Sequence, residues 1–244
     1  MKKILVIGES AVDIYVYCDA IRLAPDIPVP VLNINQKKQN DGMAMNVFNN
    51  IKVFHNNIDI MTNDNWRNLT KTRYVHEQTN HMFFRVDKNE NIKRINIRNI
   101  SYDYEAIIVS DYNKGFLKEE DIQEICSNHK NVFVDTKKKL GNWVANAKII
   151  KINDYEFQNS KPFLDSSFEN KIIHTLGPNG CEFNGRHYPV KSVKVADSSG
   201  AGDSFMAAFV IKYLVTFSFE KSIIYANEKA SWVVTQKGVV TINK

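Results

Sequence analysis

Short apolar runs recur along the chain and predict buried β-strands. The first is ILVIG at residues 4–8, and similar runs follow at 106–110, 131–135, 147–153 and 171–175. A run that is apolar at nearly every position, instead of at alternate ones, is typical of a strand buried on both faces. We therefore expect these segments to form the centre of one sheet.

Helical patterns lie between these runs. In residues 116–129, Leu117, Ile122 and Ile125 fall near helical spacing, while lysines and glutamates face outward. Residues 201–215 are apolar nearly all round, which predicts a buried helix. Strands that alternate with helices in this way predict an α/β fold of three layers, in which helices cover both faces of a mainly parallel sheet.

Two regions depart from this pattern. Residues 14–40 contain Pro25, Pro28 and Pro30, which exclude a helix and favour edge strands. Residues 71–98 alternate polar and apolar positions, as half-exposed antiparallel strands do. Together the two regions predict a small sheet that projects from the α/β body. A lid over a site and a sheet that pairs two subunits are equally compatible with this pattern.

Length and composition limit the class of protein. The 244 residues are enough for one large domain, and we expect a single domain over residues 1–244 that includes the projecting sheet. The net charge of +5 is mild, and the longest basic run is the three lysines at 137–139. Nucleic-acid binding would favour a denser basic face, and an anionic small substrate fits this modest excess just as well, so the charge alone does not decide between them. From the chain as a whole we expect a small-molecule substrate and neither a nucleic acid nor a membrane as partner. The longest wholly apolar stretch, residues 205–211, is far too short to span a membrane.

The cysteines and the first residues bear on the cellular compartment. Cys18, Cys126 and Cys181 are odd in number and far apart, which predicts reduced thiols and neither a disulfide nor a metal site. The apolar run after the first lysines spans only residues 4–7, too short for a signal peptide. We therefore expect a cytoplasmic protein.

The stretch ADSSGAGDSFMAAF, residues 196–209, carries the main candidate chemistry. The strand-like residues 192–195 precede it, and the buried helix follows, so Gly200, Ala201 and Gly202 are expected at the helix N-terminus. Unpaired N–H groups and the positive end of the helix dipole make an anion site there, and glycine lets a phosphate approach the backbone. Asp203, in the first turn, would deprotonate an attacking hydroxyl. This arrangement suits phosphoryl transfer.

A purely structural alternative stays open for this stretch. Gly200 and Gly202 could simply make a tight turn from strand to helix, with Asp203 interacting with the helix dipole. A GxGD pattern alone does not separate the two interpretations. The stretch is not a P-loop, because the GxxxxGK[ST] spacing is absent.

Several motifs together resemble one family. DSSGAGDSF is similar to the DTTGAGD signature of the ribokinase-like (PfkB) carbohydrate kinases. The first part of the chain, from ILVIG to NVFNNI, resembles the start of bacterial heptose-7-phosphate kinases. VSDYNKGFL, VDTKKK, KINDYEF and TLGPNGCEF resemble their SDYGKG, VDPKG, NxxE and TxGxxG segments. These motifs occur in family order from residue 4 to about residue 240, which is far more specific than any one of them.

The resemblance implies a ribokinase-like fold with a β lid and ATP-dependent phosphorylation of a sugar or sugar phosphate, close to heptose 7-phosphate. Asp203 would be the catalytic base, and Gly200, Ala201 and Gly202 would form the anion hole. The residues that would contact the sugar hydroxyls are Asp13, Gly42 and Asn46. Carboxylate and amide groups suit this role because they pair with several hydroxyls.

The resemblance also implies sites for the nucleotide and its metal ion. Asn153 and Glu156 would position Mg²⁺, largely through water. Residues bordering the nucleotide would be Thr175, Gly177 and Gly180, with Asn227 near the base. Asp197 would help to bind a monovalent cation such as K⁺. Structural alternatives remain: Asn153 and Glu156 could cap a helix, and 177–180 could be a plain hairpin turn.

A substrate that already carries a phosphate would need cationic partners. Arg73, Arg85 and Lys114 are candidates, because they lie in the lid-like strands or in a loop at the sheet end, and arginine pairs bidentately with phosphate. For each residue alone, a solvated charge on an exposed strand explains the sequence equally well.

The chain departs from the family pattern where the sugar would bind. Asp41-Gly42 stands in place of a glycine pair, and Met43 and Met45 stand where small residues are usual. These changes would alter which sugar fits. A different PfkB-type sugar or nucleoside kinase, or a catalytically silent sugar- or nucleotide-binding homologue, therefore remains as an alternative.

Overall fold

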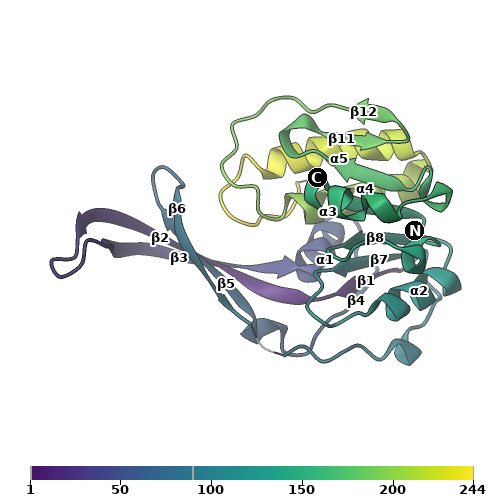
Figure 1. Cartoon of the computed structure of the whole chain (residues 1–244), viewed down its shortest axis with the longest axis horizontal. Coiled ribbons are helices and arrows are strands. Elements are labelled where there is room, and N and C mark those ends of the chain that lie inside the picture. Colours follow the sequence, from purple (N-terminus) through teal and green to yellow (C-terminus); the bar gives the residue numbers. More distant parts are fainter. Residues whose placement is uncertain (1, 90, 244) are drawn as a thin grey trace.

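The computed structural model describes residues 2–89 and 91–243. It consists of a three-layered body and a long β arm that projects from it (Figure 1). The three layers agree with the fold expected from the alternating strand and helix patterns.

The body is built on an eight-stranded sheet with the order β12-β11-β10-β9-β8-β7-β1-β4. From β4 to β10 the neighbours are parallel, while β11 and β12 add an antiparallel edge. The strands are β1 (Ile4–Gly8), β4 (Ile58–Met61), β7 (Ala106–Asp111), β8 (Val132–Thr136), β9 (Ile149–Asn153), β10 (Ile172–Thr175), β11 (Cys181–Phe183) and β12 (Arg186–Tyr188). The five apolar runs of the sequence thus form neighbouring strands, which is why they are apolar on both faces.

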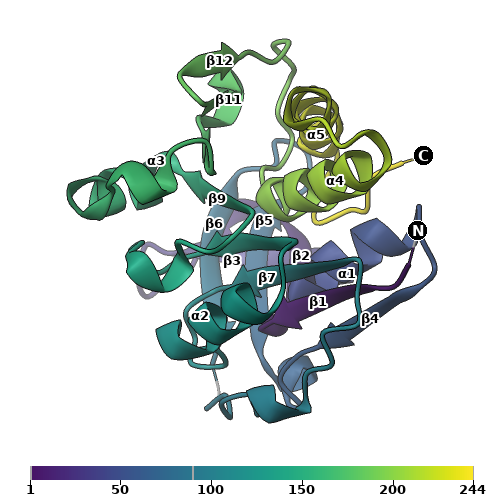
Figure 2. The ribbon, with the colours of Figure 1, turned by 90° about the vertical axis from the view of Figure 1, so that its right-hand side faces the viewer.

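Helices cover both faces of this sheet (Figure 2). Ile4 and Val6 of β1 pack with helices α1, α4 and α5, whereas Leu5 and Ile7 face the side of α2. The helices are α1 (Ala44–Lys52), α2 (Glu119–Asn128), α3 (Asp154–Ser160), α4 (Ala201–Thr216) and α5 (Phe219–Val233). In the part of the chain that the structure describes, no helix combines the length and the apolarity needed to cross a membrane.

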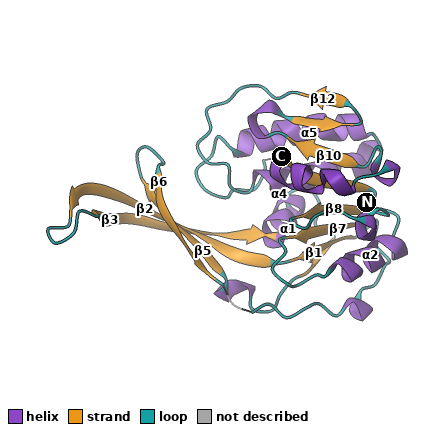
Figure 3. Ribbon diagram, in the orientation of Figure 1, coloured by secondary structure: helices purple, strands orange, loops and turns teal. Residues whose placement is uncertain are grey.

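The four remaining strands form a separate sheet, called here the arm sheet, with the order β3-β2-β5-β6 (Figure 3). Its strands are β2 (Ser10–Leu23), β3 (Pro30–Met43), β5 (Thr70–His76) and β6 (Met82–Lys88). The β2–β3 hairpin, with two strands of 14 residues each, extends well beyond the body. The arm sheet thus comes mainly from the two regions that depart from the α/β pattern, and it extends beyond them to residues 10–13, 41–43 and 70.

Two local predictions from the sequence are wrong. The alternation in residues 71–98 predicts strands up to residue 98, but β6 ends at Lys88, and Ile92, Ile95 and Ile97 pack against the α2 side of the body. Their spacing therefore reflects packing of an irregular segment. Residues 192–195 are all exposed and lie outside the described strands, because this segment is a surface connection to α4.

The arm sheet contacts both the segment before α4 and the segment after α5, and Asn80 of the β5–β6 turn donates to the backbone oxygen of Ala196. Tyr15, Tyr17 and Val75 form a small buried cluster with Val239. Lys237 Nζ also donates to the backbone oxygen of Glu77 at 2.8 Å. The arm sheet therefore rests on the same loops that lead into and out of the C-terminal helices.

Candidate active site

Polar side chains gather where the parallel strands end and α4 begins, and Asp203 lies among them. Its side chain is only 4% exposed. One carboxylate oxygen accepts a hydrogen bond from the Tyr112 hydroxyl at 2.6 Å, and the other accepts from Asn46 Nδ2 at 3.0 Å. Asn46 comes from α1 and Tyr112 follows β7, so three distant segments meet at this carboxylate.

The surroundings of Asp203 adjust its acidity. Burial raises the pKa of Asp203 to about 6, while the hydrogen bonds from Tyr112 and Asn46 oppose that rise. Asp135 adds to the rise, and Lys151 counters it. The carboxylate is therefore mostly ionised at neutral pH but more basic than an ordinary aspartate, as a general base should be.

The two glycines before Asp203 have close neighbours. Gly200 has φ of +77°, and a Cβ there would come within 2.8 Å of Asn46 Nδ2. At Gly202, a Cβ would come within 2.8 Å of Lys151 Nζ. Among the described residues, no side chain caps this end of α4. The turn from Gly200 to Gly202 can therefore present backbone N–H groups and a nearby ammonium to an anion.

Lys151 is a site residue that the sequence analysis missed. It lies on β9 and pairs with Asp135 of β8 at 2.5 Å, and both side chains are more than nine-tenths buried. The other oxygen of Asp135 has no hydrogen-bond partner in the described part of the chain. A lysine inside an otherwise apolar strand could have revealed this pair, because buried lysines need a compensating charge.

Asp13 and Gly42, two of the residues predicted to contact the sugar, meet on the arm sheet close to the body. Asp13 of β2 forms a buried ion pair with Arg73 of β5. Gly42 lies so close to the Asp13 carboxylate that any side chain at position 42 would displace it. Burial lowers the pKa of Lys71, although the charges of Asp13 and Asp203 raise it. Lys71, which the sequence analysis did not single out, is therefore close enough to both Asp13 and Asp203 to be influenced by their charges.

The other two predicted phosphate partners are more exposed. Arg85 is paired with Asp87 at 2.8 Å, and its side chain is 46% exposed. It lies opposite Arg73 in the ladder between β5 and β6. Lys114 donates to Asn89 Oδ1 at 3.2 Å. Both side chains can thus move toward a ligand, in contrast to the buried Arg73.

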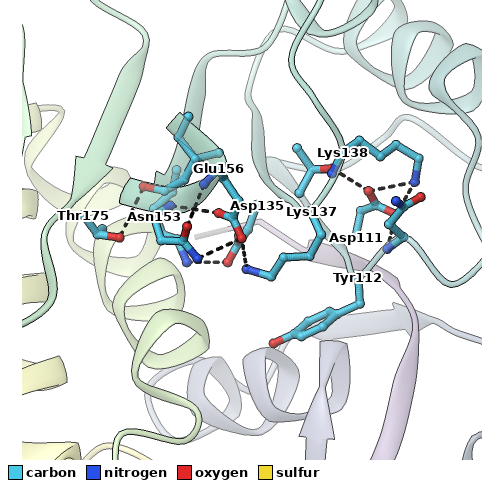
Figure 4. Close-up of polar contacts among 12 residues, drawn as sticks. Asp111, Tyr112, Asp135, Lys137, Lys138, Asn153, Glu156 and Thr175 are labelled. Carbon is cyan, nitrogen blue, oxygen red and sulfur yellow. Dashed lines mark hydrogen bonds and ion pairs between the residues drawn. The ribbon is translucent and has the colours of Figure 1, made fainter. Parts of the chain in front are cut away.

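Asn153 and Glu156 form a reciprocal cap at the start of α3 (Figure 4). The Asn153 side chain accepts from the Glu156 N–H at 2.9 Å, and Glu156 accepts from the Asn153 N–H at 2.8 Å. Lys137 Nζ lies 2.5 Å from Glu156 Oε1. The structural alternative, a helix cap, is therefore present, and this carboxylate can serve a metal ion best through water.

A cavity of about 400 Å³ adjoins Glu156 and is lined by Lys137, Lys138, Lys139 and the exposed Tyr155. A larger cavity of about 640 Å³ lies where residues 60–66 meet residues 91–96. Of the described residues that line the larger cavity, none belongs to the predicted site.

The residues predicted to border the nucleotide lie around the β10–β11 hairpin. Gly177 and Gly180 have positive φ, and Thr175 donates to the backbone oxygen of Ile152 at 3.2 Å. A hairpin turn, the alternative noted from the sequence, is thus the observed geometry. Asn227 is buried on α5 and donates to the Tyr188 oxygen at 3.0 Å. This amide holds α5 against β12. A position for Asn227 beside the base of the nucleotide stays a prediction.

Two further positions show how the departures from the family pattern are accommodated. The Asp41 carboxylate accepts from Asn49 Nδ2 at 3.0 Å, so a residue of α1 satisfies it. Met43 has φ of 62°, a conformation that side chains rarely adopt, and it packs in a buried cluster with Ala11 and Leu69. Asp197, the predicted cation ligand, accepts from the Ser199 N–H at 2.8 Å.

Residues 60–244 match the family model of the pfkB family carbohydrate kinases, so the chain belongs to this family. The family resemblance seen in the sequence motifs is thereby confirmed.

Curated relatives span the chain as well. The bifunctional protein HldE of Helicobacter pylori strain G27 is 29% identical over 297 aligned positions, which cover 98% of this chain and 64% of that protein. HldE of Hydrogenovibrio crunogenus is 25% identical over 99% of this chain and 61% of that protein. The chain thus spans less than two thirds of the length of these relatives.

Solved structures share the fold. Ribokinase from Thermotoga maritima superposes with a TM-score of 0.71 at 15% identity, covering 98% of this chain and 95% of that chain. The nucleoside kinase of Methanocaldococcus jannaschii gives a TM-score of 0.72 at 16% identity, covering 98% and 93%. The ribokinase-like fold expected from the motifs is therefore confirmed.

Proposed function

We propose that the protein transfers a phosphoryl group from ATP to a hydroxyl of a sugar phosphate, with Asp203 as the catalytic base. The observation that carries this proposal is the position of a buried carboxylate, with a pKa of about 6, in the first turn of the uncapped helix α4. A base placed there can take the hydroxyl proton while N–H groups of the same turn attract the transferring phosphoryl group.

The acceptor in this proposal is an anionic sugar close to heptose 7-phosphate. The motifs that resemble heptose-7-phosphate kinases support it, and so does the charge around Asp13. Lys71 and Arg73 lie beside that carboxylate, and Arg85 and Lys114 are free enough to close on a phosphate. Asp13 and Asn46 would hold sugar hydroxyls, and Gly42 leaves room for Asp13 to do so.

On the donor side, Glu156 and Asn153 would hold Mg²⁺ through water, and Mg²⁺ supplies neutralisation of phosphate charge when it is bound. Thr175, Gly177 and Gly180 would border the nucleotide. Asp197 would support a monovalent cation, and the resemblance to family members is the argument for it. Use of ATP fits the expected cytoplasmic location.

The arm sheet would act both as a lid and as a contact between two copies of the chain. Exposed apolar side chains lie on its outer strands β3 and β6 (Ile34, Met82, Phe84 and Val86) and at the far end of the β2–β3 hairpin (Ile21, Leu23, Ile27 and Val29). A monomer would leave these side chains in water, whereas pairing of two arms would bury them. A homodimer through the arm sheet is therefore part of the proposal.

The proposal is tested by coupled ADP release with Mg-ATP over a panel of sugars, nucleosides and sugar phosphates that includes heptose 7-phosphate. Wild type and Asp203→Asn are assayed side by side. Turnover with a sugar phosphate that is lost in Asp203→Asn supports the proposal. Turnover with a nucleoside alone would assign another kinase. Ligand-induced rises in melting temperature without turnover would identify a silent binding protein.

A further inference from the structure

We propose that Tyr112 is a positioning residue for phosphoryl transfer: its hydroxyl holds the Asp203 carboxylate in its working orientation, and Glu9 holds the loop that carries Tyr112. The inference rests on the proposed function, because it assigns a role in the reaction of Asp203. Neither residue was singled out by the sequence motifs, although Tyr112 lies within one of them.

The two donors on Asp203 come from different sides. Tyr112 donates to Oδ1 at 2.6 Å and Asn46 donates to Oδ2 at 3.0 Å. With one donor on each oxygen, the carboxylate plane is fixed. Each carboxylate oxygen still has a second lone pair, so one of them remains able to accept a substrate hydroxyl. A fixed base of this kind loses little entropy when the acceptor binds.

The Tyr112 ring is itself held without the help of its hydroxyl. It packs against the cluster of Ala11, Met43 and Leu69. The ammonium of Lys71 lies 5.0 Å from the ring centre, and that of Lys137 lies 5.7 Å from it. Cations are attracted to the face of an aromatic ring. The ring is therefore in contact both with Lys71, on the side of the predicted sugar residues, and with Lys137, which pairs with Glu156. In Figure 4 the Tyr112 side chain points away from the Asp111–Lys138 pair.

Glu9 fixes the backbone beneath Tyr112. This carboxylate is 0% exposed and follows β1 directly. It accepts hydrogen bonds from the backbone N–H groups of Tyr112 at 2.8 Å, Lys114 at 2.8 Å and Phe116 at 3.3 Å. Three N–H groups on one buried carboxylate hold the loop tightly, because charge-assisted hydrogen bonds are strong. The loop cannot shift without breaking them.

The charged neighbours determine what removal of the Tyr112 hydroxyl would do. Asp203 is faced by Asp135 of β8 and Lys151 of β9, and Tyr112 is faced by Asp13 of β2, Lys71 of β5 and Lys137 after β8. All of these remain in Tyr112→Phe. The variant therefore removes one hydrogen bond to the ionised carboxylate, and the pKa of Asp203 should rise.

The test compares Tyr112→Phe with Tyr104→Phe. Tyr104 is a matched control, because its hydroxyl also donates to a carboxylate, Asp59, at 2.8 Å, but outside the site. In Tyr112→Phe we expect the acidic limb of the kcat/KM profile for the acceptor to move up by about one pH unit and kcat to fall roughly tenfold, with the KM for ATP unchanged. Tyr104→Phe should keep the wild-type profile.

Glu9→Gln gives a second readout. It keeps the size of the side chain but weakens the hold on the loop, so kcat should fall in the same direction. Adding Tyr112→Phe to Glu9→Gln should then cost less than it does in the wild type, because both changes act through one contact. Additive losses would overturn the role of Glu9.

A direct titration separates this inference from the proposed function. The Asp203 carboxyl is followed by ¹³C NMR in wild type and Tyr112→Phe. A pKa that rises by about one unit in the variant supports the hold of Tyr112 on Asp203. An unchanged pKa together with an unchanged kcat profile overturns it. A wild type that turns over none of the acceptors overturns the proposed function, and the titration still decides whether Tyr112 controls Asp203.

Discussion

Lys151 lies against the backbone of Gly202, so closely that a Cβ at position 202 would come within 2.8 Å of its Nζ. The ammonium of a buried strand residue therefore reaches the first turn of α4. Positive charge from this lysine and from the helix N-terminus converges on one point beside Asp203. This convergence is what an anion hole for a transferring phosphoryl group needs.

We expect Lys151→Met to lower kcat by roughly 100-fold, because one stabilising charge beside the anion hole is lost. The variant should also lose about 3–5 kcal/mol of stability, since Asp135 is left buried without its partner. Lys151→Met combined with Asp135→Leu should recover much of that stability but none of the activity. Steady-state kinetics and urea unfolding measure the two effects. Recovery of activity in the double variant would refute the role in the reaction.

Asp203→Asn should abolish turnover and at the same time stabilise the protein at neutral pH. Burial raises the pKa of Asp203 from 3.8 to about 6, so the folded state binds this proton more tightly than the unfolded state does. Ionisation of Asp203 therefore costs stability that increases as the pH rises from 3.8 to about 6 and is complete above about 6, and roughly 1–3 kcal/mol should be regained in the variant at pH 7.5.

The advantage of Asp203→Asn should shrink as the pH falls from about 6 toward 4, because the wild-type carboxyl then becomes protonated. Turnover of the wild type should decline over the upper part of the same interval. Melting temperatures and initial rates between pH 4.5 and 8 measure both. A stability difference that does not depend on pH would argue against the raised pKa.

Gly42→Ala should raise the KM for the acceptor strongly and leave the KM for ATP nearly unchanged. The added methyl group would displace the Asp13 carboxylate, which holds Arg73 in place. The expected rise is about 10- to 100-fold, the usual effect of losing one well-placed charged hydrogen bond. Saturation kinetics for both substrates provide the measurement, and an equal rise in both KM values would contradict this assignment.

Arg85→Ala and Lys71→Met test how a phosphate on the acceptor is recognised. Each should raise the KM for the acceptor while the KM for ATP stays nearly unchanged, and Lys71→Met should have the larger effect because Lys71 is more deeply placed. An acceptor analogue without the phosphate supplies the control, since its KM should respond little. Equal responses to both acceptors would exclude a phosphate-specific role.

The apolar outer strands of the arm sheet predict that Phe84→Lys and Ile34→Lys convert a dimer into a monomer. Both side chains are about half exposed or more in one copy of the chain, at 49% and 64%. Light scattering after size-exclusion chromatography measures the mass. Wild type that is monomeric at micromolar concentration would rule out the proposed homodimer.

The sequence alone was enough to predict the strands of the body and the ends of α4, because the patterns that indicate them are local. Apolar runs marked β1 and β7 to β10, and the glycines around Ala201 marked the start of a buried helix. Asp203 and Asn46, singled out separately through the family motifs, are hydrogen-bonded to each other in the structure.

The remaining site residues depend on packing between segments that are far apart, which no local pattern encodes. Lys151 was hidden within an apolar run, and its partner Asp135 is on another strand. Glu9 lies just beyond the first apolar run, and nothing local indicates that it binds a loop more than one hundred residues away. The segment around Ile95 alternates like a strand but packs on the body, because periodicity does not reveal which surface a side chain meets.

The hydrogen bond between Asn46 and Asp203 joins residues 157 positions apart. The active site around Asp203 can therefore assemble only late in folding, after most of the chain has been synthesised and the body sheet has formed. Contacts of such long range slow folding, because loop closure must precede their stabilising effect. The exposed apolar side chains of the arm stay available to other chains throughout this time, so the protein should depend on dilute conditions or on chaperones to refold into an active form.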